Sequence, residues 1–343
     1  AGQGRLSDSR VLCIGAGGLG SPVLSYLCAA GVGRIGVMDD DVVDETNLQR
    51  QTLFTMDDVG RPKVEVAVER LQSANPYVSF DAILQQIDGS NAREIVRCYD
   101  VVVDCTDSFT ARYLINDACF FENKPDVYGS IFRFDGQVSI FGRGGPCYRC
   151  LFPQPPPPGA IPSCAEGGVL GALAGIVGAL QASEVLKLVL DIGAPLRGRL
   201  LIVDALSARV REIAIDRDPD CRLCGQSPTL HDVSIVAIED ATRIVQIDPS
   251  ELDTLGNATV LDVREPHEAV LGAMPGSVQI PASQLEARLH ELDSSQTYIV
   301  ACRLGARSQW AFERLRDAGF KKLFHLRGGL LAYTAVDEDF NFF

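Results

Sequence analysis

Four glycines near the start of the chain have the spacing of a phosphate-binding turn. They follow an apolar run at residues 11–14 and precede a helix-like stretch at residues 21–30. At such a strand-to-helix turn the backbone N–H groups point toward the ligand, and glycine lets phosphate oxygens approach the backbone closely. The turn consists of Gly15, Gly17, Gly18 and Gly20. The pattern predicts a nucleotide-binding loop, which alone fits NAD as well as ATP.

The polar residues that follow this loop favour a triphosphate. A second apolar run, residues 34–38, leads into Asp39, whose carboxylate can accept hydrogen bonds from ribose hydroxyls. Arginine gives forked hydrogen bonds to phosphate, and lysine gives a compact positive charge. Cationic and amide side chains follow at Asn47, Arg50, Gln51 and Lys63. The shared pyrophosphate of a dinucleotide does not need so many cations, so we expect ATP here.

Two Cys-x-x-Cys pairs predict a structural metal site. They consist of Cys147 with Cys150 and Cys221 with Cys224. Four thiolates suit tetrahedral zinc, and a closed shell of four sulfurs leaves no position for a substrate. The alternative is two unrelated pairs of buried cysteines. Five further cysteines lie in apolar surroundings and are expected to be packing residues, namely Cys13, Cys28, Cys98, Cys105 and Cys119.

A cysteine on a second strand-to-helix loop predicts a reactive thiol. Cys302 directly follows an apolar run, 298–301, and precedes a helical pattern at 310–318. Converging amides and neighbouring arginines favour the thiolate form of a cysteine at such a position. The loop residues after it are Arg303, Leu304, Gly305, Ala306 and Arg307. The alternative interpretation is a small apolar residue at the end of a strand.

Strand and helix patterns alternate along the chain and then restart, which predicts an α/β protein of two domains. Single cores rarely exceed roughly 250 to 300 residues, and this chain has 343. We assign residues 1–228 to the first domain, 229–240 to a polar linker and 241–343 to a smaller α/β domain.

The composition excludes two classes of partner. A net charge of −14 and a pI near 4.8 argue against nucleic acids, which need clustered Lys and Arg. The most apolar stretch, residues 167–183, is shorter than the roughly 20 residues that span a bilayer, so it predicts a buried helix rather than a membrane segment. No charged-then-apolar leader opens the chain, so we expect a cytoplasmic protein.

The first domain resembles the molybdopterin-synthase and sulfur-carrier-protein adenylyltransferases, relatives of ubiquitin-activating enzymes. The motifs are the glycine turn, the acidic residues 39–41, Asn-Leu-Gln-Arg-Gln at 47–51, Gly-Arg-Pro-Lys at 60–63 and Asp-Cys-Thr-Asp at 104–107. The resemblance implies a Rossmann-like, ubiquitin-activating-type adenylation domain with a mixed sheet and structural zinc. It also implies a homodimer.

This resemblance implies a reaction and a set of site residues. The reaction is Mg²⁺-ATP-dependent adenylation of the C-terminal glycine of a small ubiquitin-like sulfur carrier that ends in Gly-Gly. By position, Asp39 would hold the ribose, and Asn47, Arg50 and Lys63 the phosphates. Asp107 would help to place magnesium.

The second domain resembles a rhodanese sulfurtransferase. The motifs are Asp-Val-Arg-Glu at 262–265, the loop at 302–308 and Arg-Gly-Gly at 327–329. The resemblance implies a persulfide on Cys302, loaded by thiosulfate or a cysteine desulfurase. The short loop favours sulfur over the phosphate that related phosphatases admit. Cys164 matches a second cysteine of the adenylyltransferases and would release a thiocarboxylate by forming a disulfide with Cys302. Alternatively, Cys164 is buried at the start of the next helix.

Two other functions compete with this one. A non-catalytic scaffold would bind the ubiquitin-like protein without activating it. An NAD-dependent oxidoreductase would use the same glycine turn but has no need of Arg50, Lys63 or the Cys302 loop.

The adenylyltransferases also carry an arginine on an upstream helix that reaches the ATP of the neighbouring subunit. Neither Arg5 nor Arg10 matches that motif. The pathway stays open among molybdopterin, thiamine, thiolated tRNA, cysteine and siderophores.

Overall fold

The computed structural model describes residues 2–155, 168–233, 246–256, 258–269, 272–274, 276–303 and 305–334. Cys164 and Leu304 therefore lie outside the described residues. The chain divides into two compact units, Ala1–Ile238 and Glu239–Phe343, and the division falls inside the linker predicted from sequence, 229–240. Each unit has its own core and is described by itself.

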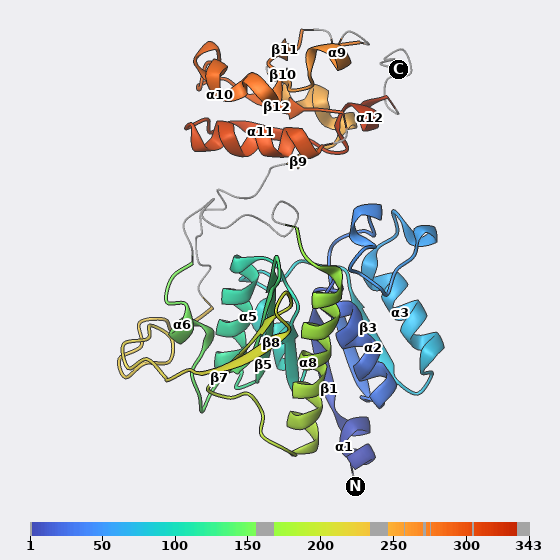
Figure 1. Cartoon of the computed structure of the whole chain (residues 1–343), viewed down its shortest axis with the longest axis vertical. Helices are drawn as coiled ribbons and strands as arrows, with labels where there is room; N and C mark the ends of the chain where they lie inside the picture. Colours follow the sequence, from blue (N-terminus) through green and yellow to red (C-terminus); the bar gives the residue numbers. More distant parts are fainter. Residues whose placement is uncertain are drawn as a thin grey trace. The chain divides into compact units, whose positions relative to one another are not determined.

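The first unit is built on one mixed sheet (Figure 1). Its eight strands are β1 (Arg10–Ile14), β2 (Arg34–Met38), β3 (Ser79–Ile83), β4 (Val101–Asp104), β5 (Asp126–Phe132), β6 (Asp135–Phe141), β7 (Arg199–Asp204) and β8 (Arg209–Ala214). The order is β3-β2-β1-β4-β5-β6-β7-β8. The strands from β3 to β5 pair in parallel, and the pairs from β5 to β8 are antiparallel. The expected α/β fold with a mixed sheet is confirmed.

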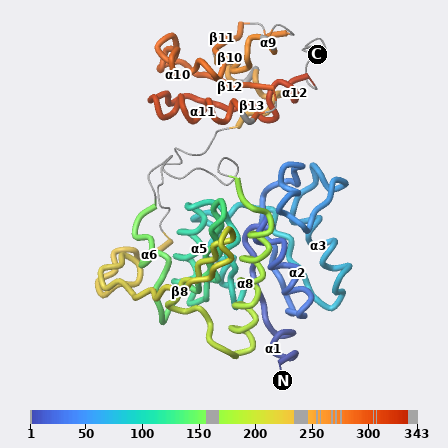
Figure 2. The backbone as a smooth tube through the Cα atoms, viewed as in Figure 1, coloured from blue at the N-terminus to red at the C-terminus, as the bar shows by residue number. Residues whose placement is uncertain are grey.

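Helices cover both faces of this sheet because successive side chains of a strand point to opposite faces. Val11 and Cys13 of β1 belong to one core, and Leu12 and Ile14 belong to the other. The first core includes residues of α2 (Gly20–Ala30), α3 (Lys63–Ala74) and α8 (Gly171–Leu190), and the second includes α4 (Ala92–Arg97) and α5 (Phe109–Phe121). Helices α1 (Gly2–Asp8) and α6 (Tyr148–Leu151) and the 3₁₀ turns η1 (Glu45–Asn47) and η2 (Met56–Asp58) complete the described elements, whose trace Figure 2 shows.

Helix α8 is the apolar helix predicted around 167–183. By length and composition alone this helix could cross a membrane. In the structure, however, it contacts β5 and β6 and buries Leu173, Val177 and Gln181. The Gln181 amide donates to the carbonyls of Asp104 and Val127, at 2.7 and 3.0 Å. These are the contacts of a core helix.

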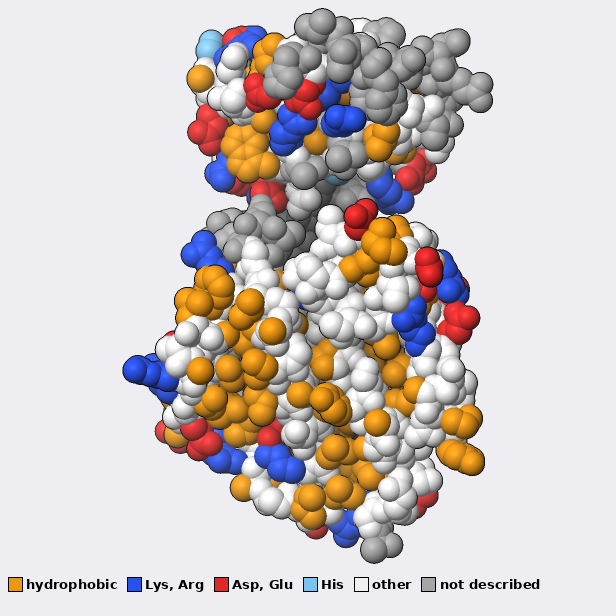
Figure 3. All heavy atoms as spheres, turned by 45° about the vertical axis from the view of Figure 1, so that its right-hand side comes forward, with side chains coloured by type: hydrophobic (Ala, Val, Ile, Leu, Met, Phe, Trp, Pro, Cys, Tyr) orange, Lys and Arg blue, Asp and Glu red, His pale blue; other side chains and the backbone are white. Residues whose placement is uncertain are grey.

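Apolar side chains lie on the surface of the first unit, and Figure 3 shows them over much of its visible face. All six residues of strand β8 are exposed. The exposed apolar side chains on and near the sheet edge are Phe134, Leu206, Val210 and Ile213.

The second unit is a smaller α/β layer. Its strands are β9 (Gln246–Ile247), β10 (Thr259–Asp262), β11 (Val278–Gln279), β12 (Tyr298–Ala301) and β13 (Leu323–Leu326), all parallel in the order β11-β10-β12-β13-β9. The helical segments are η3 (Pro249–Leu255), α9 (Pro266–Ala269), η4 (Ala282–Gln284), α10 (Leu285–Arg288), η5 (Leu289–Glu291), α11 (Ala306–Asp317) and α12 (Gly329–Tyr333). Helix α11 begins four residues earlier than the sequence pattern predicted, directly after the Cys302 loop.

Candidate functional sites

A cavity of about 180 Å³ opens at the carboxyl ends of strands β1, β2 and β4. Ligands of open parallel sheets bind at this edge because the strand-to-helix loops converge there. The cavity is lined by most of the residues predicted to bind nucleotide, namely Gly15, Gly17, Gly18, Asp39, Arg50, Gln51, Lys63 and Asp107. Gly20 and Asn47, predicted with them, are not among its lining residues.

The glycine turn depends on two positions where no other residue fits. Gly15 has a φ of +95°, and a Cβ there would lie 2.8 Å from the carbonyl oxygen of Cys105. A Cβ on Gly20 would overlap the carbonyl oxygen of Gly15. Gly20 therefore lets the turn close against the carbonyl of Gly15 without lining the cavity. The other three glycines, Gly15, Gly17 and Gly18, do line it.

Asp39 lies at the end of β2, where its carboxylate accepts hydrogen bonds from the backbone N–H groups of Ala16 (2.7 Å) and Asp41 (2.9 Å). Burial raises the pKa of Asp39, and the charge of Lys63 partly opposes that shift. Lys63 opens helix α3 and is itself buried, with its Nζ 2.8 Å from the exposed carboxylate of Asp41. A positive charge is thus held at the cavity wall by a partner that water can reach.

In the segment after β2, some amide and cationic side chains line the cavity and others support those that do. The Nε2 of Gln51 donates to Oδ1 of Asn47 at 2.9 Å, so Asn47 supports a cavity residue rather than lining the cavity. Arg50 is half-buried, and among the described residues its guanidinium makes one long hydrogen bond, from Nη1 to the Thr46 carbonyl at 3.4 Å. The guanidinium therefore has most of its hydrogen-bonding capacity left for a ligand.

Asp107 is exposed at the cavity, beside a cation that the sequence reading missed. Arg112 of α5 is buried in the wall, donates from Nη2 to the Thr106 carbonyl at 3.1 Å and lies over the ring of Tyr128. Asp104 beneath it accepts hydrogen bonds from the N–H and the hydroxyl of Thr106, and burial raises its pKa. The sequence did offer one signal for this residue: an arginine lies one turn into the helix that follows Asp-Cys-Thr-Asp.

The four paired cysteines come together in one cluster. Their sulfur atoms all lie within 4.8 Å of one another, with Cys147 3.5 Å from Cys221 and Cys150 3.3 Å from Cys224. Zn–S bonds of about 2.3 Å in a tetrahedron separate neighbouring sulfurs by roughly 3.8 Å. The cluster therefore fits a tetrahedral metal ion with four thiolate ligands.

Helix α5 connects this cluster to the cavity. Its first turn carries Arg112, and its later residues hold the first cysteine pair. Asn116 accepts a hydrogen bond from the N–H of Tyr148 at 2.7 Å, and Asp117 forms a buried ion pair with Arg149 at 2.7 Å. Because Tyr148 and Arg149 lie between the two cysteines of that pair, the cluster fixes the far end of the helix that lines the cavity.

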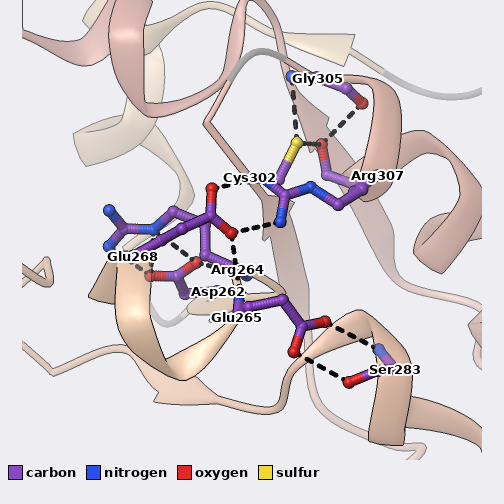
Figure 4. A network of polar contacts seen from close by, with 9 residues as sticks. Asp262, Arg264, Glu265, Glu268, Ser283, Cys302, Gly305 and Arg307 are labelled. Atoms are coloured by element: carbon purple, nitrogen blue, oxygen red, sulfur yellow. Dashed lines mark hydrogen bonds and ion pairs between the residues drawn. The ribbon is translucent and has the colours of Figure 1, made fainter. Parts of the chain in front are cut away.

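The Cys302 loop forms a small cradle in the second unit. Cys302 is buried at the end of β12, and the N–H of Gly305 donates to its Sγ at 3.1 Å (Figure 4). The Ser308 hydroxyl lies 3.4 Å from the same sulfur. Gly305 has a φ of +110°, which turns the loop back over the sulfur before α11 begins at Ala306.

Acidic residues orient the second arginine of the loop. Figure 4 shows Arg307 paired with Glu268, whose Oε1 accepts from Nη2 at 2.7 Å, and Glu265 bound to Ser283. The hydrogen bond to Glu268 raises the pKa of Arg307. Beneath them Asp262 and Arg264 form a fully buried ion pair at 2.7 Å. Arg303 takes part through its carbonyl, which accepts from the N–H of Leu331 in α12.

One prediction on an individual residue needs correction. Cys98, expected to pack in an apolar environment, is exposed, because it caps the end of the short helix α4. The early arginines are held within their own unit: Arg5 donates to the Leu190 carbonyl, and Arg10 pairs with Asp100 at 2.8 Å. Neither Arg5 nor Arg10 is among the residues that line the cavity.

Comparison with known proteins finds a family match for each of the two units. A model of the ThiF family matches residues 1–223, and a model described as a rhodanese-like domain matches residues 248–336. The chain is 41% identical, over 97% of its length and 88% of the relative's, to the probable adenylyltransferase/sulfurtransferase MoeZ of Mycobacterium tuberculosis. It is 54% identical, over 66% of its length and 86% of the relative's, to the sulfur carrier protein adenylyltransferase of Thermus thermophilus.

A solved structure supports the fold of the first unit. E. coli MccB matches with a TM-score of 0.60 at 24% identity, over 65% of this chain and 69% of that protein. The glycine turn, the cavity and the Cys302 cradle lie within the two matched regions. The chain therefore belongs to the ThiF family and carries a rhodanese-like domain in the same polypeptide.

Proposed function

We propose that this protein adenylates the C-terminal glycine of a small ubiquitin-like sulfur carrier and then transfers sulfur to it. It is an adenylyltransferase and a sulfurtransferase, like the relative that matches 97% of the chain. In the first step the carrier's terminal carboxylate attacks the α-phosphorus of ATP, and pyrophosphate leaves. Arg50 and Lys63 line the cavity, and their positive charges would stabilise the charge that develops on the phosphates.

In the second step a persulfide on Cys302 attacks the activated carbonyl carbon. A carbon–sulfur bond forms, AMP leaves with the electron pair of the broken C–O bond, and the carrier is joined to Cys302 as an acyl disulfide. Cys164 is the proposed thiol for the last step. Its thiolate attacks the Cys302 sulfur, so that a Cys164–Cys302 disulfide forms and the carrier leaves as a thiocarboxylate. An external thiol must then reduce the disulfide.

Two metal ions belong to this proposal. Zinc would occupy the cluster formed by Cys147, Cys150, Cys221 and Cys224, whose spacing supports a structural role. Magnesium would be held by Asp107, whose exposed carboxylate suits a hard cation, and would supply positive charge beside the phosphates. We also propose a cytoplasmic homodimer that receives sulfur from thiosulfate or a cysteine desulfurase, and the apolar surface of the first unit supports contact with protein partners.

One observation carries the proposal: Arg50, Lys63 and Asp107 line the same cavity as the glycine turn. Carrier-dependent exchange of labelled pyrophosphate into ATP tests it, because exchange reports the adenylate before any sulfur moves. We expect exchange to fall at least a hundredfold in Arg50→Ala and Lys63→Ala, given the usual cost of removing a transition-state donor, ~10²–10³. Arg61→Ala is the matched control, since Arg61 is an exposed cation beside Lys63 that pairs with Glu69.

The same assay separates the other functions. A scaffold would bind the carrier without exchange, and an oxidoreductase would bind NAD and show neither. Cys302→Ser should abolish transfer of sulfur from thiosulfate to cyanide and leave pyrophosphate exchange intact. Full exchange in both Arg50→Ala and Lys63→Ala would refute the proposed role of the cavity.

A further inference from the structure

The hydroxyl of Ser308 has three possible hydrogen-bond acceptors and only one hydrogen. Its Oγ lies 2.9 Å from the Gly305 carbonyl oxygen, 3.0 Å from Nε2 of His325 and 3.4 Å from Sγ of Cys302. Ser308 is fully buried and His325 nearly so, so water does not decide the direction of this hydrogen. The neighbouring groups must decide it.

The ring of His325 is the group that can do so. Its Nε2 also lies 3.0 Å from the Gly305 carbonyl oxygen, which can only accept a hydrogen bond. A bare Nε2 lone pair would face that oxygen and be repelled by it. Its Nδ1 is buried and has no hydrogen-bond partner among the described residues. A hydrogen on Nδ1 would therefore be an unsatisfied buried donor, which is costly.

Both observations favour the neutral tautomer with its hydrogen on Nε2. Burial also lowers the pKa of His325, which keeps the ring neutral. In this tautomer Nε2 donates to the Gly305 carbonyl and the Ser308 oxygen and has no lone pair left to accept the serine hydrogen. That hydrogen then has two acceptors, the Gly305 carbonyl and the sulfur of Cys302, and an ionised sulfur attracts it more strongly than a neutral carbonyl does.

We infer that Ser308 is a catalytic residue that donates a hydrogen bond to the Cys302 thiolate, and that His325 is a positioning residue that aims this hydroxyl. The Gly305 N–H supplies the second donor at 3.1 Å. This inference rests on the proposed sulfurtransferase function of the same loop. It adds a side-chain donor to a cradle that the sequence reading assigned to the loop residues 303–307 alone.

The pair of donors acts where charge collects on Sγ. During loading, the Cys302 thiolate attacks the outer sulfur of thiosulfate, a sulfur–sulfur bond forms, and sulfite leaves with the electron pair of the bond that breaks. During transfer to cyanide, the cyanide carbon bonds to the outer sulfur of the persulfide. The Cys302 sulfur–sulfur bond then breaks, and its electron pair returns to Sγ as a thiolate. The free thiolate occurs in both half-reactions, so losing its donor should slow both.

The test measures alkylation of Cys302 by iodoacetamide across pH in the full-length protein. Mass spectrometry of the Cys302 peptide distinguishes this thiol from the other cysteines. We expect Ser308→Ala to raise the pH midpoint of alkylation by about one unit, and to lower the rate about tenfold below that midpoint, as expected for losing one hydrogen bond to a charged group. Ser308→Thr keeps a hydroxyl and should stay near wild type.

Two variants of His325 test the positioning role. His325→Leu removes the donor and should shift the midpoint as Ser308→Ala does, whereas His325→Gln places an amide N–H near the position of Nε2 and should restore it. The double variant Ser308→Ala/His325→Leu should shift no further than Ser308→Ala, because both act through one hydroxyl. Circular dichroism and urea unfolding show whether the second unit of each variant is folded.

Two results would overturn the inference. One is an unchanged midpoint in folded Ser308→Ala, and the other is a double variant whose shift equals the sum of the single shifts, which would make His325 independent of the hydroxyl. Failure of the proposed function looks different: wild-type protein would then form no persulfide from thiosulfate at all.

Discussion

Among single residues, Gly15 limits what the nucleotide turn can tolerate. Its φ of +95° and the 2.8 Å approach of a Cβ to the Cys105 carbonyl oxygen combine backbone strain with a clash. We expect Gly15→Ala to cost about 3 kcal/mol of unfolding free energy, at the upper end for a strained backbone position. ATP binding should fall with it, because the loop must move away from Cys105.

Gly60→Ala is the matched control for this variant. Gly60 has a φ of +87°, but a Cβ there meets nothing within 4 Å. It should therefore cost only the left-handed strain, about 1 kcal/mol. Urea unfolding gives both free energies and calorimetric titration gives ATP affinity, and equal effects of the two substitutions would show that the clash at Gly15 is unimportant.

Sequence patterns located those cavity-lining residues that belong to contiguous motifs. They are recognisable by their place after a strand, namely Gly15, Gly17, Gly18, Asp39, Arg50 and Lys63. Asn47 lies in the same motif, yet which of its residues faces the cavity depends on the turn at 45–47. Contacts between segments that are distant in the sequence were also missed, because they depend on the fold and not on a local pattern. No pattern near His325 indicates that β13 brings it beside the Cys302 loop.

Among the elements, helix ends were harder to predict than strands. The strands at 11–14, 34–38 and 298–301 agree with the structure to within a residue, because burial on both faces leaves a continuous apolar run. Helix α11 was placed too late, since its first turn carries Arg307 and Ser308 rather than apolar residues. Arg307 binds Glu268 and Ser308 lies beside the sulfur of Cys302. These polar positions interrupt the amphipathic pattern by which a helix is recognised.

One carboxylate joins two helices and gives a pH-dependent prediction. Glu122, at the end of α5, accepts from Arg93 and Arg97 of α4 at 2.7 and 2.9 Å. The hydrogen bond from Arg97 lowers the pKa of Glu122 to about 2, from an ordinary 4.5. Because the folded pKa is depressed, this stabilisation is complete above pH 4.5 and is lost as the pH falls toward 2.

Glu122→Gln should therefore lower the unfolding free energy by about 1 kcal/mol at neutral pH, less than the pKa shift alone implies, because solvent screens the arginines. The difference from wild type should shrink as the pH falls below 4.5 and approach zero near pH 2. Glu212→Gln is the control, since Glu212 pairs with Arg199 at a more exposed site and should cost less. Urea unfolding at several pH values gives the comparison, and a constant difference would contradict the assigned cause.

For the whole molecule, the division into two units predicts that each unit can unfold and lose its activity without the other. The cysteine cluster belongs entirely to the first unit. Metal removal by a chelator, or Cys221→Ser, should lower the melting temperature of that unit and abolish pyrophosphate exchange, because structural zinc contributes directly to folding. Thiosulfate-to-cyanide transfer should persist.

Cys98→Ser is the control, because Cys98 is exposed and outside the cluster. Elemental analysis should find one zinc per chain in the wild type and none in Cys221→Ser. Loss of both activities on chelation would show instead that the two units depend on each other for stability.

The back of the Cys302 loop is fastened by α12. The N–H groups of Leu330 and Leu331 donate to the carbonyls of Cys302 and Arg303, at 2.8 and 3.0 Å. Both donors lie after β13, while both acceptors lie before α11. A polypeptide truncated before Leu330 would therefore lack the two hydrogen bonds that hold the backbone of Cys302 and Arg303.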